Sequence, residues 1–160
     1  MRQVFAVIFL ALLFFSGCSL KTPNTNQTLG ELLQSIGTPK EEALLLDKKA
    51  HDYALTLKDN YGSKLPPVWH NTFVNLGFKS RGLCWHYAHD LYEYIAPLTK
   101  SLDAVIVVAH LGSWMKEHSA LVLTCLGCSI EEGVVLDAWR DRKKLIYLPV
   151  KEDIYPWRPR

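Results

Sequence analysis

The spacing of the apolar residues changes near residue 100, and this change limits the folds open to the chain. Before it, residues 83–95 place Leu83, Tyr87, Leu91 and Ile95 four positions apart, as one face of a helix requires. After it, residues 104–109 form a β-branched run typical of a central strand, and residues 118–125, 133–139 and 145–150 have the length and composition of further strands. Helices followed by strands predict an α+β domain, with the helices packed on an antiparallel sheet.

Two more helices are expected before the one at residues 83–95. Residues 28–37 have the pattern of a short helix, and residues 38–60 that of a long one. Thr38 can cap the long helix, Pro39 suits its first position, and Glu41 completes a capping box. Charged residues such as Lys58 mix with apolar ones along it, so one side is expected to face solvent.

The N-terminal residues have the pattern of an export signal. One positive charge precedes an apolar run at residues 4–15, which is shorter than a membrane-spanning helix and ends in small residues before Cys18. Residues 13–18 resemble the lipobox of bacterial lipoproteins. That resemblance implies removal of residues 1–17, a diacylglyceryl group on the Cys18 sulfur, and acylation of the new N-terminus by a fatty acid such as palmitate. A secreted protein cleaved elsewhere is the alternative.

Residues 18–27 are polar and lack periodicity, so they are interpreted as a lipidated tether. Residues 28–150 are interpreted as a single domain, and the basic, proline-containing residues 151–160 as a loose C-terminal tail. The formal net charge is only +2, and charges of both signs are mixed along the chain. A basic stripe interleaved with aromatic residues is absent from the sequence, so nucleic-acid binding has no support.

The four cysteines divide into three groups. Cys18 is assigned to lipid, while Cys125 and Cys128 are separated by only Leu126 and Gly127 at a predicted hairpin turn. A local disulfide is the preferred interpretation of this pair in an oxidising compartment, followed by two ordinary apolar cysteines. A redox motif would need a helix N-terminus, and zinc would need two more ligands. Cys84 is left without a partner and is flagged as a reactive thiol.

Cys84 follows Gly82 and Leu83 at the predicted start of a helix. The helix dipole and free backbone N–H groups there favour the thiolate, which is the nucleophilic form. Downstream, His118 begins one predicted strand and Asp137 lies near the end of the next. Cysteine, histidine and aspartate in this order are typical of a covalent acyl-transfer site, with Cys84 as nucleophile, His118 as general base and acid, and Asp137 orienting the imidazole.

A hairpin with a tight turn at Gly127 and Cys128 would bring the last two residues together. In that register His118 faces Asp137 and Ala120 faces Val135, and opposed side chains lie about 5 Å apart at Cβ. Both faces of this hairpin are largely apolar, so the sheet is expected to be covered on both sides. Asp141 is the rival acid, but it lies among basic residues and is interpreted as a solvated turn charge.

The segment from Gly82 to Ala88 resembles the nucleophile motif of the transglutaminase-like superfamily. The segments around His118 and around Asp137 and Trp139 are similar to the histidine and aspartate segments of that superfamily. The resemblance covers roughly residues 66–140 and implies a papain-like fold with Cys–His–Asp chemistry. It departs from the pattern where an aromatic residue is missing after His118 and where the domain leaves little room for an elaborate cleft.

The resemblance also implies the supporting residues. The backbone N–H of Cys84 would be one oxyanion donor and Trp69 the candidate for a second. From their positions in the chain, Trp85, His86, His110 and Trp139 are interpreted as lining the cleft, and for His110 a structural role is the preferred alternative. The substrate would be an amide of a peptide, a protein or peptidoglycan, and the thioester would pass to water or to an amine without metal or cofactor.

Two other functions stay open. One is a non-catalytic peptide- or protein-binding module on the same fold, and the other is a domain stabilised by zinc on Cys125, Cys128 and histidines. In either case the chain is expected to be exported and anchored by lipid to the cell envelope. Ser19 after the lipidated cysteine resembles the sorting signal for the outer membrane, which would place the domain on its periplasmic face.

Overall fold

The computed structural model describes residues 26–113 and 116–160 and has an α+β architecture. The expected signal peptide, the Cys18 lipidation site and most of the tether lie outside the described residues. Within the described ranges, four helices precede the sheet: α2 (Leu29–Ser35), α3 (Lys40–Asn60), α4 (Pro67–Asn75) and α5 (Cys84–Ile95). Among the described residues, no helix is both long enough and apolar enough to cross a membrane.

The sheet is antiparallel and five-stranded, in the order β4-β3-β2-β1-β5. Its strands are β1 (Leu102–Ala109), β2 (His118–Cys125), β3 (Val134–Asp137), β4 (Ile146–Pro149) and β5 (Arg158–Pro159). Short 3-10 turns occupy η1 (Ala96–Leu98), η2 (Ile130–Glu132) and η3 (Val150–Glu152). The helices-then-strands prediction is therefore confirmed, and β5 is an additional strand.

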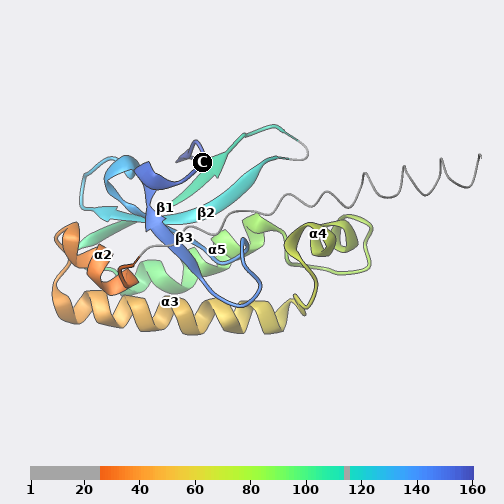
Figure 1. Cartoon of the computed structure of the whole chain (residues 1–160), viewed down its shortest axis with the longest axis horizontal. Coiled ribbons are helices and arrows are strands. Elements are labelled where there is room, and N and C mark those ends of the chain that lie inside the picture. The colour runs from red at the N-terminus through yellow and green to blue at the C-terminus, as the bar shows by residue number, and fades with distance from the viewer. Residues whose placement is uncertain (1–25, 114–115) are drawn as a thin grey trace, which may run out of the picture.

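Both faces of the sheet are covered, as expected from the apolar residues on each side. Figure 1 shows α2, α3 and α5 together on one side, where they pack on Leu121, Leu123, Val134 and Leu136. The opposite face carries Ala120, Val122 and Val135, which pack against η2, η3 and Trp157. Two apolar layers thus hold the central strands β2 and β3 between them.

The β2–β3 register differs from the predicted one by two residues. Leu121 pairs with Leu136 and Val122 with Val135, so the position opposite Asp137 is Ala120 rather than His118. The connection is longer than a tight turn, because η2 lies between the Cys125–Cys128 segment and β3. A shift by an even number leaves each side chain on its predicted face.

Two local expectations near α3 are wrong. Thr38 does not cap α3: its hydroxyl is buried without a hydrogen-bond partner, and α3 begins after Pro39. The capping box is formed instead at α2, between Thr28 and Glu31. Lys58 is also not on the solvated side, since it is buried and its ammonium donates to the Ala138 carbonyl at 2.6 Å.

Residues 151–160 are not a loose tail. Arg158 pairs with Val108 and Pro159 with Val107, which places β5 on the free edge of β1. Trp157 is 8 % exposed and belongs to the apolar layer on the outer face of the sheet. The C-terminus consequently lies on the side of the sheet away from α3 (Figure 1).

Candidate active site

Cys84 is the first residue of α5, and the backbone that leads into it is held tightly. Gly82 has φ +122°, and a Cβ on it would lie 2.0 Å from Nε2 of His70. That nitrogen is hydrogen-bonded to the Arg81 carbonyl at 3.0 Å. Only glycine can adopt this conformation in the space available, so the close approach of His70 fixes the entry into the helix.

His86 completes the start of the helix. Its Nδ1 accepts hydrogen bonds from the backbone N–H groups of Gly82 and Leu83, at 3.2 and 3.1 Å. Burial of the ring and the nearby Arg81 cation lower the pKa of His86, which suits a neutral acceptor. His86 was expected to line the cleft, but the structure uses it as a cap, while Trp85 beside it is 48 % exposed.

His118 and Asp137 form a buried pair at one end of the sheet. Nε2 of His118 lies 2.5 Å from Oδ2 of Asp137, and both side chains are almost wholly removed from solvent. Burial lowers the pKa of His118, but the charge and hydrogen bond of Asp137, with a smaller contribution from Cys84, raise it to about 9. The imidazolium is therefore the stable form of this ring near neutral pH.

Asp137 is held by more than its histidine. Its Oδ1 accepts the backbone N–H groups of Trp139 and Arg140, both at 3.0 Å, and its Oδ2 also accepts Nε of Arg140 at 3.0 Å. Burial alone would raise the pKa of this carboxyl, but His118 and Arg140 together hold it well below its usual range. Asp137 is thus a fixed carboxylate, and Asp141, which accepts the Lys143 N–H instead, does not compete with it.

The thiol of Cys84 is close to the imidazole without being hydrogen-bonded to it. The sulfur is directed toward the Glu117 carbonyl at 3.8 Å, next to His118 in the chain. Nδ1 of His118, the ring nitrogen not used by Asp137, is buried and has no hydrogen-bond partner among the described residues. Cys84 is among the groups that raise the pKa of His118.

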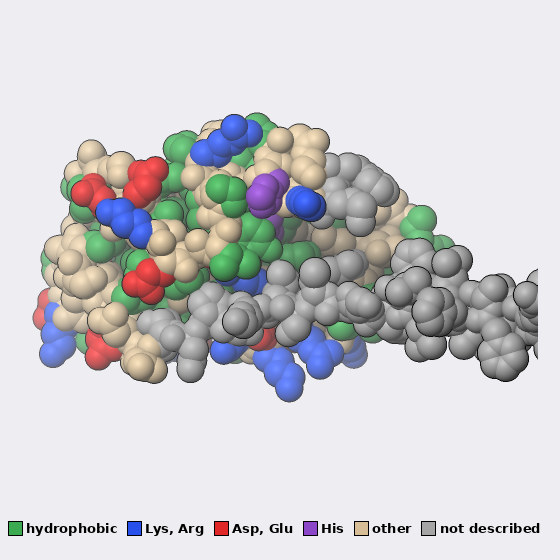
Figure 2. Space-filling view, turned by 45° about the horizontal axis from the view of Figure 1, so that its top comes forward, with side chains coloured by type: hydrophobic (Ala, Val, Ile, Leu, Met, Phe, Trp, Pro, Cys, Tyr) green, Lys and Arg blue, Asp and Glu red, His purple; other side chains and the backbone are tan. Residues whose placement is uncertain are grey.

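Aromatic side chains surround the imidazole. The ring centroids of Tyr155, Trp139 and Trp157 lie 4.8, 4.9 and 5.4 Å from that of His118. His110, which has φ +52° and is exposed, lies at the border of this cluster with its ring 6.3 Å from Tyr155. Figure 2 shows histidine at the surface of one face, bordered by hydrophobic and basic side chains. Trp139 therefore packs beside the His118 ring, and His110 lies at the border of the aromatic cluster.

Trp69 does not take the role expected of it. Its side chain is 54 % exposed on α4, whereas the next two residues, His70 and Asn71, contact the core of the site region. Asn71 accepts the indole N–H of Trp139 at 3.0 Å, and His70 supports Gly82. The described contacts give Trp69 no link to Cys84, so the second oxyanion donor is unassigned.

The sequence interpretation missed the residues that hold Asp137 from behind. Arg140 is 6 % exposed and binds Asp153 through both terminal nitrogens, at 3.0 and 2.7 Å. Trp157 donates its indole N–H to the same carboxylate at 2.9 Å. Two features of the sequence could have indicated these contacts. Arg140 lies only three residues after Asp137, and the segment interpreted as a tail contains aromatic residues.

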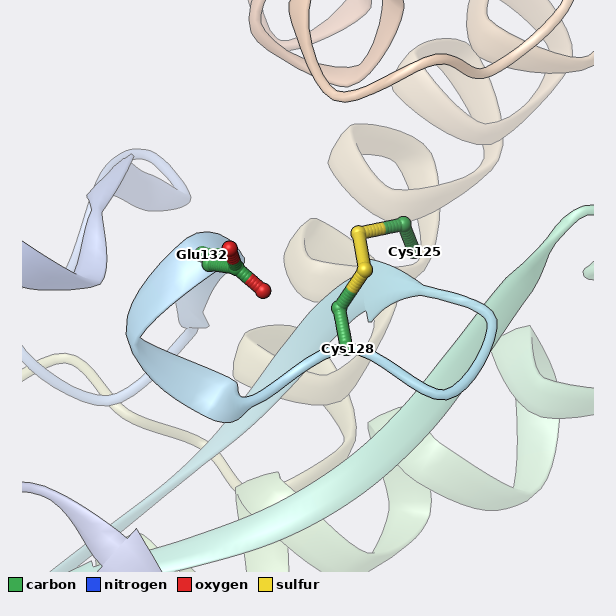
Figure 3. Close-up of side chains that lie close together, drawn as sticks. All are labelled: Cys125, Cys128 and Glu132. Carbon is green, nitrogen blue, oxygen red and sulfur yellow. A yellow bond between two sulfur atoms is a disulfide. The ribbon is translucent and has the colours of Figure 1, made fainter.

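The preferred disulfide is present in the structure. Cys125 and Cys128 are bonded to each other, and Glu132 of η2 lies beside them (Figure 3). Among the described residues, this group and an exposed one of His89, Asp90 and Glu93 are close enough to hold a metal. Cysteine ligates zinc as the thiolate, so the zinc alternative, which uses Cys125 and Cys128, would require reduction of the disulfide.

Comparison of the chain with protein-family models, with curated proteins and with solved structures gives no match.

Proposed function

We propose that this protein is a thiol enzyme that cleaves or exchanges amide bonds through Cys84, His118 and Asp137. The observation that carries the proposal is the buried His118–Asp137 pair beside a cysteine at the N-terminus of α5. A buried ion pair whose one free nitrogen faces a thiol is costly to maintain for stability alone. It has the arrangement that nucleophilic catalysis by cysteine needs.

The chemistry follows from the protonation states. In the resting site His118 already holds the proton of Cys84 as an imidazolium, and the thiolate paired with it attacks the carbonyl carbon of an amide to form a tetrahedral oxyanion. The backbone N–H of Cys84, at the start of α5, is free to donate to that oxygen. The C–N bond then breaks, the proton on His118 passes to the leaving amine, and a thioester remains on Cys84.

The second half of the reaction restores the thiolate of Cys84 and the imidazolium of His118. Water or an amine gives its proton to His118 and attacks the thioester carbon, and the C–S bond breaks to release an acid or a new amide. Asp137 stays ionised throughout and stabilises the imidazolium. This sequence needs no metal or cofactor. The substrate class we propose is an amide of a peptide, a protein or peptidoglycan.

The fold and the order of the three residues support a papain-like core of the transglutaminase-like type. The helix that carries the cysteine packs on the strand that carries the histidine, and the aspartate follows on the neighbouring strand. We further propose that Cys18 is lipidated and anchors the domain to the cell envelope, on the periplasmic face of the outer membrane.

Alkylation of Cys84 tests the enzyme proposal. The full-length protein would be treated with iodoacetamide at pH 7, and peptide mapping would separate labelling of Cys84 from that of Cys18. Cys84 is expected to react at least about ten-fold faster than in denatured protein, and His118→Ala to remove this excess. His89→Ala, on the exposed side of α5, is the matched control. Equal rates of Cys84 alkylation in folded and denatured protein would refute the proposal that this protein is an enzyme.

One observation favours the alternative of a non-catalytic binding module. Cys84 is only 9 % exposed, and its thiol points to the Glu117 carbonyl rather than to the imidazole. In that case a folded Cys84→Ser variant would keep full biological function, whereas an enzyme would lose it. Incorporation of a fluorescent primary amine into envelope peptides, dependent on Cys84, would identify acyl transfer as the activity.

A further inference from the structure

The last eight residues of the chain meet the candidate active site at several points. Asp153 binds Arg140, and Tyr155 and Trp157 flank the His118 ring. Arg160 donates to the Ser119 hydroxyl at 2.9 Å and lies 3.2 Å from Glu117, so it binds the residues on both sides of His118. Four side chains of one short segment thus converge on a single histidine and its neighbours.

The central feature is a row of alternating charges. His118, Asp137, Arg140 and Asp153 follow one another at 2.5, 3.0 and 2.7 Å, and their side chains are 4 % exposed or less. With the ring protonated, the row holds two positive and two negative charges. Arg140 and His118 share one oxygen of Asp137, so they compete for its charge. Because Arg140 also binds Asp153, its positive charge is partly neutralised there, and the charge of Asp137 acts more strongly on His118.

We propose that Asp153 and Arg140 are positioning residues, through which the C-terminal segment sets how strongly Asp137 holds and charges His118. This inference rests on the proposed function for its catalytic meaning. A purely mechanical role would only fasten the segment to the sheet. An electrostatic role predicts that the two residues act on His118 in opposite directions, and this difference makes the proposal testable.

The signs follow from the charges. Asp153→Asn removes a negative charge and frees Arg140 to bind Asp137 fully, so the pKa of His118 should fall. Arg140→Gln removes the competing cation, so the pKa of His118 should rise. Each shift is expected to be roughly half a pH unit or more for charges this close and this buried.

Other charged and titratable groups lie near this ring or near its partners and must be held constant in the comparison. They come from α3, α5, the turn before β2 and the C-terminal segment: Lys58, Cys84, His110, Glu117, Tyr155 and Arg160. None of them is changed in these variants. Glu152→Gln removes an exposed charge next to Asp153 and is the matched control.

The experiment is a nuclear magnetic resonance titration of the full-length protein carrying ¹³C-labelled histidine. The His118 signal is assigned by its loss in His118→Ala. The proposal would be supported if the pKa of His118 falls in Asp153→Asn, rises in Arg140→Gln and does not change in Glu152→Gln. Lower melting temperatures with an unmoved His118 titration would overturn it.

A second variant keeps the test decisive if a single substitution prevents folding. The double variant Arg140→Gln, Asp153→Asn leaves no unpaired charge in the interior. It should still raise the pKa of His118, because Arg140 touches Asp137 and Asp153 does not; an unchanged pKa in this variant would also overturn the proposal. The titration does not depend on thiol reactivity, so failure of the enzyme proposal in the alkylation experiment would be seen separately.

Discussion

His118 and Asp137 lie on adjacent antiparallel strands two positions out of register, yet their side chains are 2.5 Å apart. The backbones of such diagonal neighbours on paired strands lie about 7–8 Å apart. The side chains of a histidine and an aspartate are long enough to meet across this distance. The diagonal leaves Oδ1 of Asp137 to the N–H groups of Trp139 and Arg140. The offset therefore allows the carboxylate to be held from two sides.

Asp137→Asn should reduce the reactivity of Cys84 strongly, whereas Asp141→Asn should not. The amide cannot stabilise the imidazolium, and its NH2 group presents donors where one of the native oxygens accepts hydrogen bonds. We expect the alkylation rate at pH 7 to fall by about ten-fold or more, and the protein to lose about 3 kcal/mol because the buried His118 loses its counter-ion. Iodoacetamide kinetics measure the alkylation rate, and urea unfolding measures the loss of stability. A larger effect of Asp141→Asn would make Asp141 the functional acid.

The three site residues could be found from the sequence because their signals are local. Cys84 follows a glycine at a helix start, and His118 and Asp137 lie at the ends of apolar strands. The predicted register was wrong by two, yet the two side chains still meet, because a shift by an even number preserves the face of each strand residue. A shift by one would have separated them.

What the sequence could not give depends on distant contacts. Arg140 reads as one of several basic residues in a turn, and only the fold brings Asp153 to it. Lys58 has the spacing of a surface residue, and its burial follows from the position of Ala138 eighty residues away. The C-terminal residues have no period, so nothing in them alone predicts that they pair with β1.

Stability should fall as the pH rises from 7 to 8. The pKa of His118 is about 9 in the folded protein and 6.5 in the unfolded chain. Its contribution to the free energy of unfolding is therefore complete below pH 6.5 and is lost as the pH rises through 9. Asp137, whose folded pKa is lowered, contributes fully throughout this range. We expect a loss of about 1 kcal/mol between pH 7 and pH 8, measured by urea unfolding.

The pH interval is chosen to isolate His118. Burial lowers the pKa of Lys58 to about 8, and since its unfolded value is 10.5, its contribution to stability rises with pH, mainly above 8. The lowered pKa of His86 also makes stability rise with pH, but only below about pH 6.5. His118→Gln should abolish the slope between pH 7 and pH 8. An equal slope in that variant would assign the effect to another group.

Gly82→Ala should disrupt the site more than Gly77→Ala. Both glycines have positive φ, but a Cβ at Gly77 meets nothing within 4 Å, whereas one at Gly82 would overlap His70. We expect a loss of about 1 kcal/mol for Gly77→Ala, from backbone strain alone, and roughly 2–4 kcal/mol for Gly82→Ala. Alkylation of Cys84 should slow only in the second variant. Equal losses would mean that His70 moves aside at no cost.

Replacing both Cys125 and Cys128 by serine should cost stability without changing the site. The disulfide closes a loop of sequence separation 3, for which the chain-entropy relation gives about 2 kcal/mol. Cys125 lies seven positions after His118 along β2, or roughly 23 Å of extended strand, so the alkylation rate of Cys84 should not change. Thermal unfolding of the native protein with and without a chelator tests the zinc alternative in parallel. The melting temperature is expected to be the same in both, because sulfurs bonded to each other cannot ligate zinc as thiolates. A large drop with the chelator would show that a metal, and not the disulfide, stabilises this end of the sheet.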